Sequence, residues 1–292
     1  LGRPLGRPRS RDDQNMTQDI RTRYHHNGFC ILKKPVLDSD CVSAARQGMD
    51  MIRAGEYDTG TPPEPSPWNP GDDPKALCKI EQPQQANQAI RALIGSSEIG
   101  KLAATITGAK MVQVWWVQLL YKPPTSDDGT AQTRVGWHQD WNYWRTTWAP
   151  SSELLTAWVA LSEVTETSGP MQFVAGSHAW KEAGGGDFFS QHIDRSSFSV
   201  PEDQSWREIP AVMEAGGLSL HDKRTLHGSG QNTADEPRCS LAIHLRTDKS
   251  RPADSEGHGL TRFIDDADMC PIIYGTRVDS AFVVAATPEI SA

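Results

Sequence analysis

Hydrophobic residues in the second half of the chain fall into short runs that alternate with turn-forming residues. The first run, MVQVWWVQLLY at 111–121, is rich in β-branched and aromatic residues, which is typical of a strand. Five further runs are bounded by Gly, Pro, Asp or Ser: ELLTAWVALSEV, MQFVAG, GLSLHD, TLHGSG and CSLAIHLR. Many strands with this punctuation predict a mainly β fold, either a sandwich or a barrel.

The first third of the chain has a helical pattern instead. Asp38 is expected to cap a helix that runs to about Gly55, because apolar residues then recur on one face. That face is formed by Val42, Ala45, Met49 and Ile52. We therefore expect helices to brace one face of the predicted sheet.

Further helices are predicted at 16–26, 84–93 and 97–107, and a short strand at 28–34. The segment 59–74 contains six prolines and is predicted to be a loop.

The chain is expected to form one domain, because no internal repeat or linker is visible. Residues 1–15 repeat Gly-Arg-Pro and are expected to be a disordered tail or leader. The domain at 16–292 would comprise a helical part at about 16–108, a β core at about 109–250 and a C-terminal extension at about 251–292.

Composition narrows the class of protein. A formal net charge of −8 and a pI of about 5.6 argue against a nucleic-acid partner. No apolar run is long enough to span a membrane, and we see no secretory signal. The five cysteines are scattered without a C-x-x-C pair, so a reduced, cytoplasmic enzyme is expected.

Two metal-binding residue types lie close together in GWHQDWNYW at 136–144. On a strand, His138 and Asp140 would project from the same face and could bind one ion. Two imidazoles and one carboxylate, with open positions opposite, suit non-haem Fe(II) and its oxygen chemistry. His227 is the expected third ligand, because several predicted strands separate it from Asp140.

A second His-x-Asp match, His192 and Asp194, weakens the motif taken alone. It lies in a Gly- and Ser-rich region with few strands before His227, so we expect it to be fortuitous. His221, just before a turn, is the alternative third ligand.

With these motifs the chain resembles the phytanoyl-CoA dioxygenase family of Fe(II)/2-oxoglutarate oxygenases. The resemblance rests on WHQD at 137–140, AWVAL at 157–161, SGPMQFVAGSH at 168–178, HGSGQN at 227–232 and Arg238. It implies a double-stranded β-helix, a cupin-like jelly roll of two facing sheets. Residues 186–206 are harder to align with the family and are expected to form a lid or mouth loop.

The resemblance also implies roles for individual residues. His138, Asp140 and His227 match the iron ligands, and Arg238 matches the arginine that pairs with 2-oxoglutarate. A planar guanidinium suits this role because it binds a carboxylate through two parallel hydrogen bonds. Further residues expected near this co-substrate are Ser240, Ser229, Trp158 and Gln118.

The implied reaction consumes dioxygen, decarboxylates 2-oxoglutarate to succinate and oxidises a C–H bond of a small molecule. Related halogenases have a small residue at the position of Asp140, so the carboxylate favours hydroxylation. Desaturation, epoxidation and rearrangement use the same iron centre and stay open.

Aromatic residues near the motif bear on the substrate. If the strand continues past Asp140, Asn142 and Trp144 share its face, whereas Trp141 and Tyr143 point away. The residues expected to contact the substrate are Trp137, Asn142, Trp144 and Trp116. Ring faces suit an apolar or cationic small molecule. Three basic residues could meet an acidic group or be surface charges: Lys122, Arg134 and Arg145.

Two other classes of protein fit the sequence less well. A jelly-roll protein that binds a ligand or metal without turnover would have no need for Arg238. A zinc hydrolase would need a general base beside the metal, and no H-E-x-x-H motif is present. The oligomeric state is open, with a homodimer as one alternative.

Overall fold

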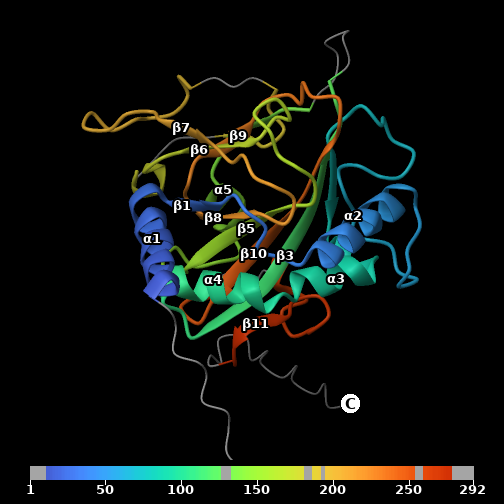
Figure 1. Cartoon of the computed structure of the whole chain (residues 1–292), viewed down its shortest axis with the longest axis horizontal. Helices are drawn as coiled ribbons and strands as arrows, with labels where there is room; N and C mark the ends of the chain where they lie inside the picture. The colour runs from blue at the N-terminus through green and yellow to red at the C-terminus, as the bar shows by residue number, and fades with distance from the viewer. Residues whose placement is uncertain (1–10, 126–132, 181–185, 192–194, 254–258, 278–292) are drawn as a thin grey trace, which may run out of the picture.

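The computed structural model describes residues 11–125, 133–180, 186–191, 195–253 and 259–277. Two antiparallel sheets dominate the fold (Figure 1). The order of the larger sheet is β1-β8-β5-β10-β3-β11, with β2 also paired to β3, and that of the smaller sheet is β4-β9-β6-β7. The strands of the larger sheet are β1 (Phe29–Leu32), β2 (Cys78–Glu81), β3 (Met111–Lys122), β5 (Leu154–Ala160), β8 (Leu218–Asp222), β10 (Arg238–Thr247) and β11 (Ile272–Gly275). The strands of the smaller sheet are β4 (Val135–His138), β6 (Met171–Val174), β7 (Glu208–Pro210) and β9 (His227–Ser229).

Four helices cover the outer face of the larger sheet, on the side away from β6, β7 and β9 (Figure 1). They are α1 (Arg11–Asn27), α2 (Ser39–Arg53), α3 (Gln88–Ile94) and α4 (Ser97–Thr107). The short elements are η1 (Pro83–Gln85), α5 (Trp141–Trp144), η2 (Ser177–Ala179) and η3 (Gly259–Thr261).

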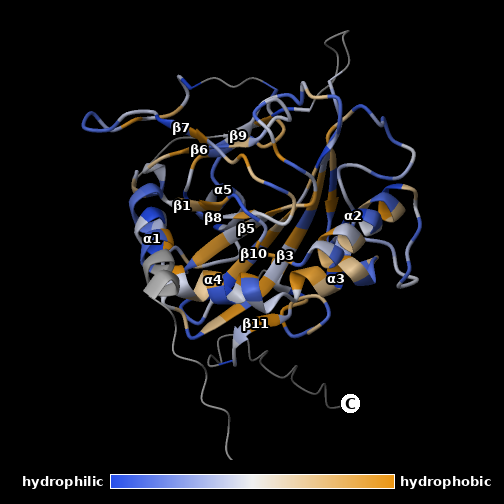
Figure 2. Ribbon diagram, viewed as in Figure 1, coloured by the Kyte–Doolittle hydropathy of each residue, from blue (hydrophilic) through white to orange (hydrophobic). Residues whose placement is uncertain are grey.

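Helix α2 shows how the sequence directs this packing. The Asp38 side chain accepts hydrogen bonds from the backbone N–H groups of Asp40 and Cys41 at 3.0 and 3.1 Å, which confirms the predicted N-cap. Met49 and Ile52, on the predicted apolar face, are fully buried in the main core cluster. Figure 2 shows that the helices carry both polar and apolar residues, whereas the central strands of the larger sheet are mostly apolar.

The long central strands are buried on both faces. On β10, Leu241 and Ile243 belong to the core cluster beneath the helices, whereas Ala242 and His244 face a cavity between the sheets. Because β10 is buried on both faces, apolar residues are favoured at nearly every position, which explains its nearly continuous apolar run. The mainly β prediction with bracing helices is confirmed.

Three differences from the predicted elements stand out. Helix α1 already begins at Arg11, within the predicted tail, and residues 1–10 lie outside the described part. The C-terminal extension adds strand β11 to the edge of the larger sheet. The strand predicted to continue past Asp140 ends at His138, and α5 follows. Among the described residues, no helix combines the length and apolarity needed to cross a membrane.

Candidate active site

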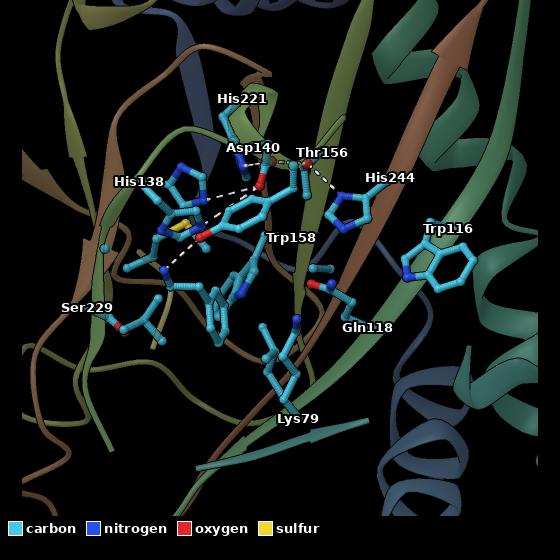
Figure 3. Close-up of a pocket in the computed structure, with 18 of the residues that line it drawn as sticks. Lys79, Trp116, Gln118, His138, Asp140, Thr156, Trp158, His221, Ser229 and His244 are labelled. Atoms are coloured by element: carbon cyan, nitrogen blue, oxygen red, sulfur yellow. Dashed lines mark hydrogen bonds and ion pairs between the residues drawn. The ribbon is translucent and has the colours of Figure 1, made fainter. Parts of the chain in front are cut away.

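A cavity of about 390 Å³ lies between the two sheets. Residues of both sheets line it, together with residues of α5 and of the segment at 186–191 (Figure 3). Phe188, in the region predicted to form a mouth loop, reaches the cavity because its segment packs closely on β4. At Gly136 a Cβ atom would meet the carbonyl oxygen of Asp187 at 2.2 Å, so only glycine permits this approach.

Two histidines and one aspartate meet at one side of the cavity. His138 ends β4, Asp140 begins the turn into α5, and His227 begins β9, which pairs with β4 opposite His138. The Asp140 Oδ1 atom lies 3.9 Å from Nε2 of His138 and 3.8 Å from Nε2 of His227. One ligand atom of each residue lies within 4.8 Å of the others, so a single ion could contact all three.

The backbone orients both imidazoles toward this point. Nδ1 of His138 donates to the carbonyl of Gly136 at 2.8 Å, and Nδ1 of His227 donates to that of Thr225 at 2.9 Å. Each Nε2 then keeps its lone pair for a metal. Burial lowers the pKa of His138 and places that of His227 well below its usual value, so both rings are neutral and ready to bind a cation.

Asp140 is held as a carboxylate. Burial raises the pKa of its carboxyl group, but His227 and His221 lower it by more, so the pKa lies below its usual value. The second oxygen, Oδ2, accepts a hydrogen bond from the Thr156 hydroxyl at 2.8 Å and lies 3.4 Å from Nε2 of His221. Oδ1 of Asp140 thus faces His138 and His227, while Oδ2 is held by the hydrogen bond from Thr156 on β5.

The sequence indicated His221 as an alternative ligand but did not indicate that Thr156 and His244 lie beside it. Thr156 on β5 pairs with His244 on β10 and with His221 on β8, so the three side chains lie side by side on one face of the sheet. The Thr156 hydroxyl also lies 2.9 Å from Nδ1 of His244. His221, the alternative ligand, contacts Asp140 from behind and is not in the three-residue cluster. The other His-x-Asp pair, 192–194, falls outside the described residues.

A second part of the cavity carries buried positive charge. Arg238 is 2% exposed and donates from Nη1 to the carbonyl of Gly169 at 2.6 Å, with its guanidinium 5.1 Å from the ring of Trp158. Lys122, paired with Arg238 across β3 and β10, is fully buried and donates to the Ser229 hydroxyl at 2.6 Å.

Neither cation forms an ion pair within the described residues, and Nε of Arg238 has no hydrogen-bond acceptor there. Burial lowers the pKa of Arg238 to about 10 and that of Lys122 well below its usual value. A buried cation without a counter-charge is costly, so Arg238, which lines this end of the cavity, fits a carboxylate ligand.

Aromatic residues line the part of the cavity around His244, and Figure 3 shows Trp116 and Gln118 beside His244 there. We call this part the aromatic arm, formed by Trp116, Gln118, Tyr143, Trp144, His244 and Glu81. Glu81 accepts hydrogen bonds from Nε1 of Trp116 at 2.6 Å and from Nε2 of Gln118 at 3.3 Å. Lys79 lies 2.8 Å from the same carboxylate, so its charge is paired.

Most residues predicted for the site do line the cavity. They are His138, Asp140, His227, Arg238, Ser229, Trp158, Gln118, Trp144 and Trp116. Ser240 is buried beside them but does not line the cavity, and its hydroxyl donates to the carbonyl of Leu120 at 3.4 Å. Of the three basic residues left open, Lys122 is buried at the site, Arg134 is half-buried away from the cavity, and Arg145 is exposed.

Two of the residues predicted to contact the substrate do not line this cavity. Trp137 points away from His138 and packs with Val174 and Trp180 in a separate cluster. Asn142 does not line the cavity, because the helical turn of α5 replaces strand alternation after Asp140. That turn brings Tyr143 to the cavity, where its hydroxyl accepts the backbone N–H of Phe188 at 2.8 Å.

A jelly roll with two histidines and an aspartate between its sheets is typical of non-haem iron oxygenases. The phytanoyl-CoA dioxygenase (PhyH) family model matches residues 24–240, and the chain belongs to this family.

Among curated proteins, a probable alpha-ketoglutarate-dependent hypophosphite dioxygenase of Stutzerimonas stutzeri is 31% identical over 59% of this chain and 58% of its own length. The peroxisomal phytanoyl-CoA dioxygenase of Homo sapiens is 24% identical over 84% of this chain and 73% of its own. Among solved structures, the epimerase SnoN with Fe3+, alpha ketoglutarate and nogalamycin RO superposes with a TM-score of 0.65 at 22% identity, covering 85% of this chain and 90% of SnoN. The structural likeness supports the jelly-roll fold.

Proposed function

We propose that the protein is a non-haem Fe(II)/2-oxoglutarate-dependent dioxygenase that hydroxylates an unactivated C–H bond of a small molecule. The observation that carries the proposal is a single buried cavity holding both the His138, Asp140 and His227 cluster and the uncompensated cation Arg238. A protein that only bound metal would not need the second feature. The relatives named as dioxygenases support the same class.

Each part of the site then has a role. The three clustered residues would hold the iron through two neutral imidazoles and one carboxylate oxygen. Arg238 would bind the distal carboxylate of 2-oxoglutarate, with Ser229 adding a hydroxyl that Lys122 orients. Trp158 would pack against the chain of the co-substrate. When bound, iron with 2-oxoglutarate and dioxygen supplies the oxidising power for attack on a C–H bond.

The chain itself would position the substrate and exclude water. The aromatic arm offers ring faces beside the cluster, so it would aim one C–H bond toward the metal. The carboxylate of Asp140 would be one of the ligands of a bound iron, which favours hydroxylation.

The remaining expectations complete this proposal. We infer a small-molecule substrate, no nucleic-acid or membrane partner, and a cytoplasmic setting, which the acidic composition and the unpaired cysteines support. The oxygenase domain would extend over 16–292.

Iron binding and turnover test the proposal together. The wild-type protein should bind one Fe(II) per chain and release succinate from 2-oxoglutarate, whereas His227→Ala should lose both. His26→Ala, which changes an exposed histidine, is the matched control and should keep both. Binding of iron without any succinate release would favour the non-catalytic alternative.

A further inference from the structure

His244 occupies the junction between the metal cluster and the aromatic arm. It is 3% exposed, lines the cavity, and packs against the rings of Trp115 and Trp144 at centroid distances of 5.7 and 4.8 Å. Its Nδ1 lies 2.9 Å from the Thr156 hydroxyl, which in turn lies 2.8 Å from Oδ2 of Asp140. Figure 3 shows this chain of contacts and the neighbouring Gln118 and Trp116.

The number of protons shared by Asp140, Thr156 and His244 determines the tautomer of His244. The Thr156 hydroxyl has one proton, and the Asp140 carboxylate can only accept, so Thr156 donates to Asp140. The contact between Thr156 and His244 then requires His244 to donate from Nδ1. Burial lowers the pKa of His244 to about 4, so the ring is neutral and its second nitrogen carries no proton. Nε2 is therefore a hydrogen-bond acceptor.

No described residue donates to Nε2 of His244, and the residue belongs to the cavity wall. Two other polar groups of the aromatic arm, Glu81 and Gln118, also offer acceptors, while the Tyr143 hydroxyl, which accepts from Phe188, keeps its own proton. Glu81 is a carboxylate, and Gln118 donates its amide N–H to Glu81, which leaves its carbonyl oxygen for the cavity. The nearby cation, Lys79, is already paired with Glu81 at 2.8 Å. The arm thus combines apolar ring faces with hydrogen-bond acceptors.

We propose that His244 is a specificity-determining residue whose Nε2 accepts a hydrogen bond from a hydroxyl or N–H group of the substrate, and that Thr156 is the positioning residue that fixes this tautomer. The inference rests on the proposed function and names its substrate class: a neutral or cationic molecule with an apolar ring framework and a hydrogen-bond donor. An anionic substrate would meet the Glu81 carboxylate in this arm, and the nearby cation Lys79 is already paired with that carboxylate. The same Thr156 hydroxyl orients the metal ligand, so the donor of the substrate is placed in fixed relation to the metal.

The tautomer can be tested directly by NMR of ¹⁵N-histidine-labelled protein loaded with Zn(II), which is diamagnetic, and 2-oxoglutarate. The resonances of His244, assigned by their loss in His244→Asn, should show a protonated Nδ1 and an unprotonated Nε2. Thr156→Val keeps the side-chain shape but removes the hydroxyl, so it should shift the ring toward the other tautomer. A wild-type ring protonated at Nε2, alone or at both nitrogens, would overturn the proposal.

Substrate selectivity can be tested with three compounds of one shape, by calorimetry on the anaerobic protein with Fe(II) and 2-oxoglutarate. The compounds are 2-naphthol, a donor; 2-methoxynaphthalene, which lacks the donor; and 2-naphthoate, an anion. We expect 2-naphthol to bind about tenfold more tightly than either of the others, the effect of one hydrogen bond of ordinary strength. His244→Asn can still donate to Thr156 but lacks Nε2, so it should abolish the difference, whereas the exposed control His26→Asn should retain it.

Equal binding of the three compounds, tightest binding of 2-naphthoate, no binding of 2-naphthol, or a preference unchanged in His244→Asn would each refute the inference. Repeating the titration without metal and 2-oxoglutarate separates this result from the proposed function. A protein that prefers 2-naphthol but never binds 2-oxoglutarate would keep the arm's selectivity and lose the oxygenase assignment.

Discussion

Lys122 and Arg238 face one another across two neighbouring strands, and within the described residues no carboxylate accompanies them. Sequence alone identified Arg238 through its place in the family motif, but left Lys122 open between the site and the surface. A sequence does not show whether a charged side chain is buried. The pairing of the strands determines that Lys122 lies next to Ser229, to whose hydroxyl it donates a hydrogen bond. Register also aligned His221, Thr156 and His244 on adjacent strands, which no spacing along the chain could indicate.

At the residue scale, Arg238→Lys should raise the KM for 2-oxoglutarate by about tenfold or more while leaving kcat similar. The reason is that lysine keeps the charge but loses the planar pair of donors that matches a carboxylate. Succinate release at varied 2-oxoglutarate concentration measures the change. Arg145→Lys, at an exposed position, is the control. An unchanged KM in Arg238→Lys would mean that the guanidinium does not bind the co-substrate.

The individual elements differ in how far the sequence could predict them. Strands β3 and β10 were predicted because apolar and β-branched runs persist along their whole length. The segment after His138 was misread, because WNYW fits a strand and a helical turn equally well. A hydrogen bond from the Arg145 N–H to the Trp141 carbonyl at 3.1 Å closes the turn. This local hydrogen bond makes the segment helical, and the prediction that Asn142 faces the cavity depended on a strand there.

The packing of α2 on the sheet is a testable property of an element. Met49→Ala should lower the free energy of unfolding by about 2–5 kcal/mol, because the side chain is fully buried and its removal leaves a cavity. Urea unfolding measures the change, with the exposed Gln47→Ala as the control. The affinity for 2-oxoglutarate should not change, since α2 packs on the face opposite to the cavity. A loss below 1 kcal/mol would show that the helix contributes little to the core.

At the scale of the whole molecule, the fold separates a stable packed face from a functional face. Helices and the outer face of the larger sheet form the main core cluster, whereas the inner face and the smaller sheet enclose the cavity. The jelly roll and the family were predicted from motifs that lie on the strands around this cavity, and both are confirmed. The added strand β11 was not predicted, because a short exposed edge strand carries little hydrophobic pattern.

Burial of the thiols gives a second whole-molecule prediction. Desolvation raises the pKa of Cys30, Cys78 and Cys270 to about 12 and that of Cys239 to about 11. Iodoacetamide at neutral pH should therefore modify the native protein mainly at the half-buried Cys41, since the thiolate is the reactive form. Peptide mass spectrometry locates the label, and unfolding in urea should expose all five cysteines. Rapid labelling of Cys239 in the native state would show that the core under the helices opens readily.

The proposed function requires that one cavity holds iron and 2-oxoglutarate together. It is tested most directly by adding 2-oxoglutarate to the anaerobic Fe(II)-loaded protein while recording the visible spectrum. Bidentate chelation of iron by the keto acid should give a weak absorption band that saturates at one equivalent per chain, disappears in His227→Ala, and needs far more 2-oxoglutarate in Arg238→Ala than in Arg145→Ala. Absence of the band when Fe(II) is bound would contradict the account.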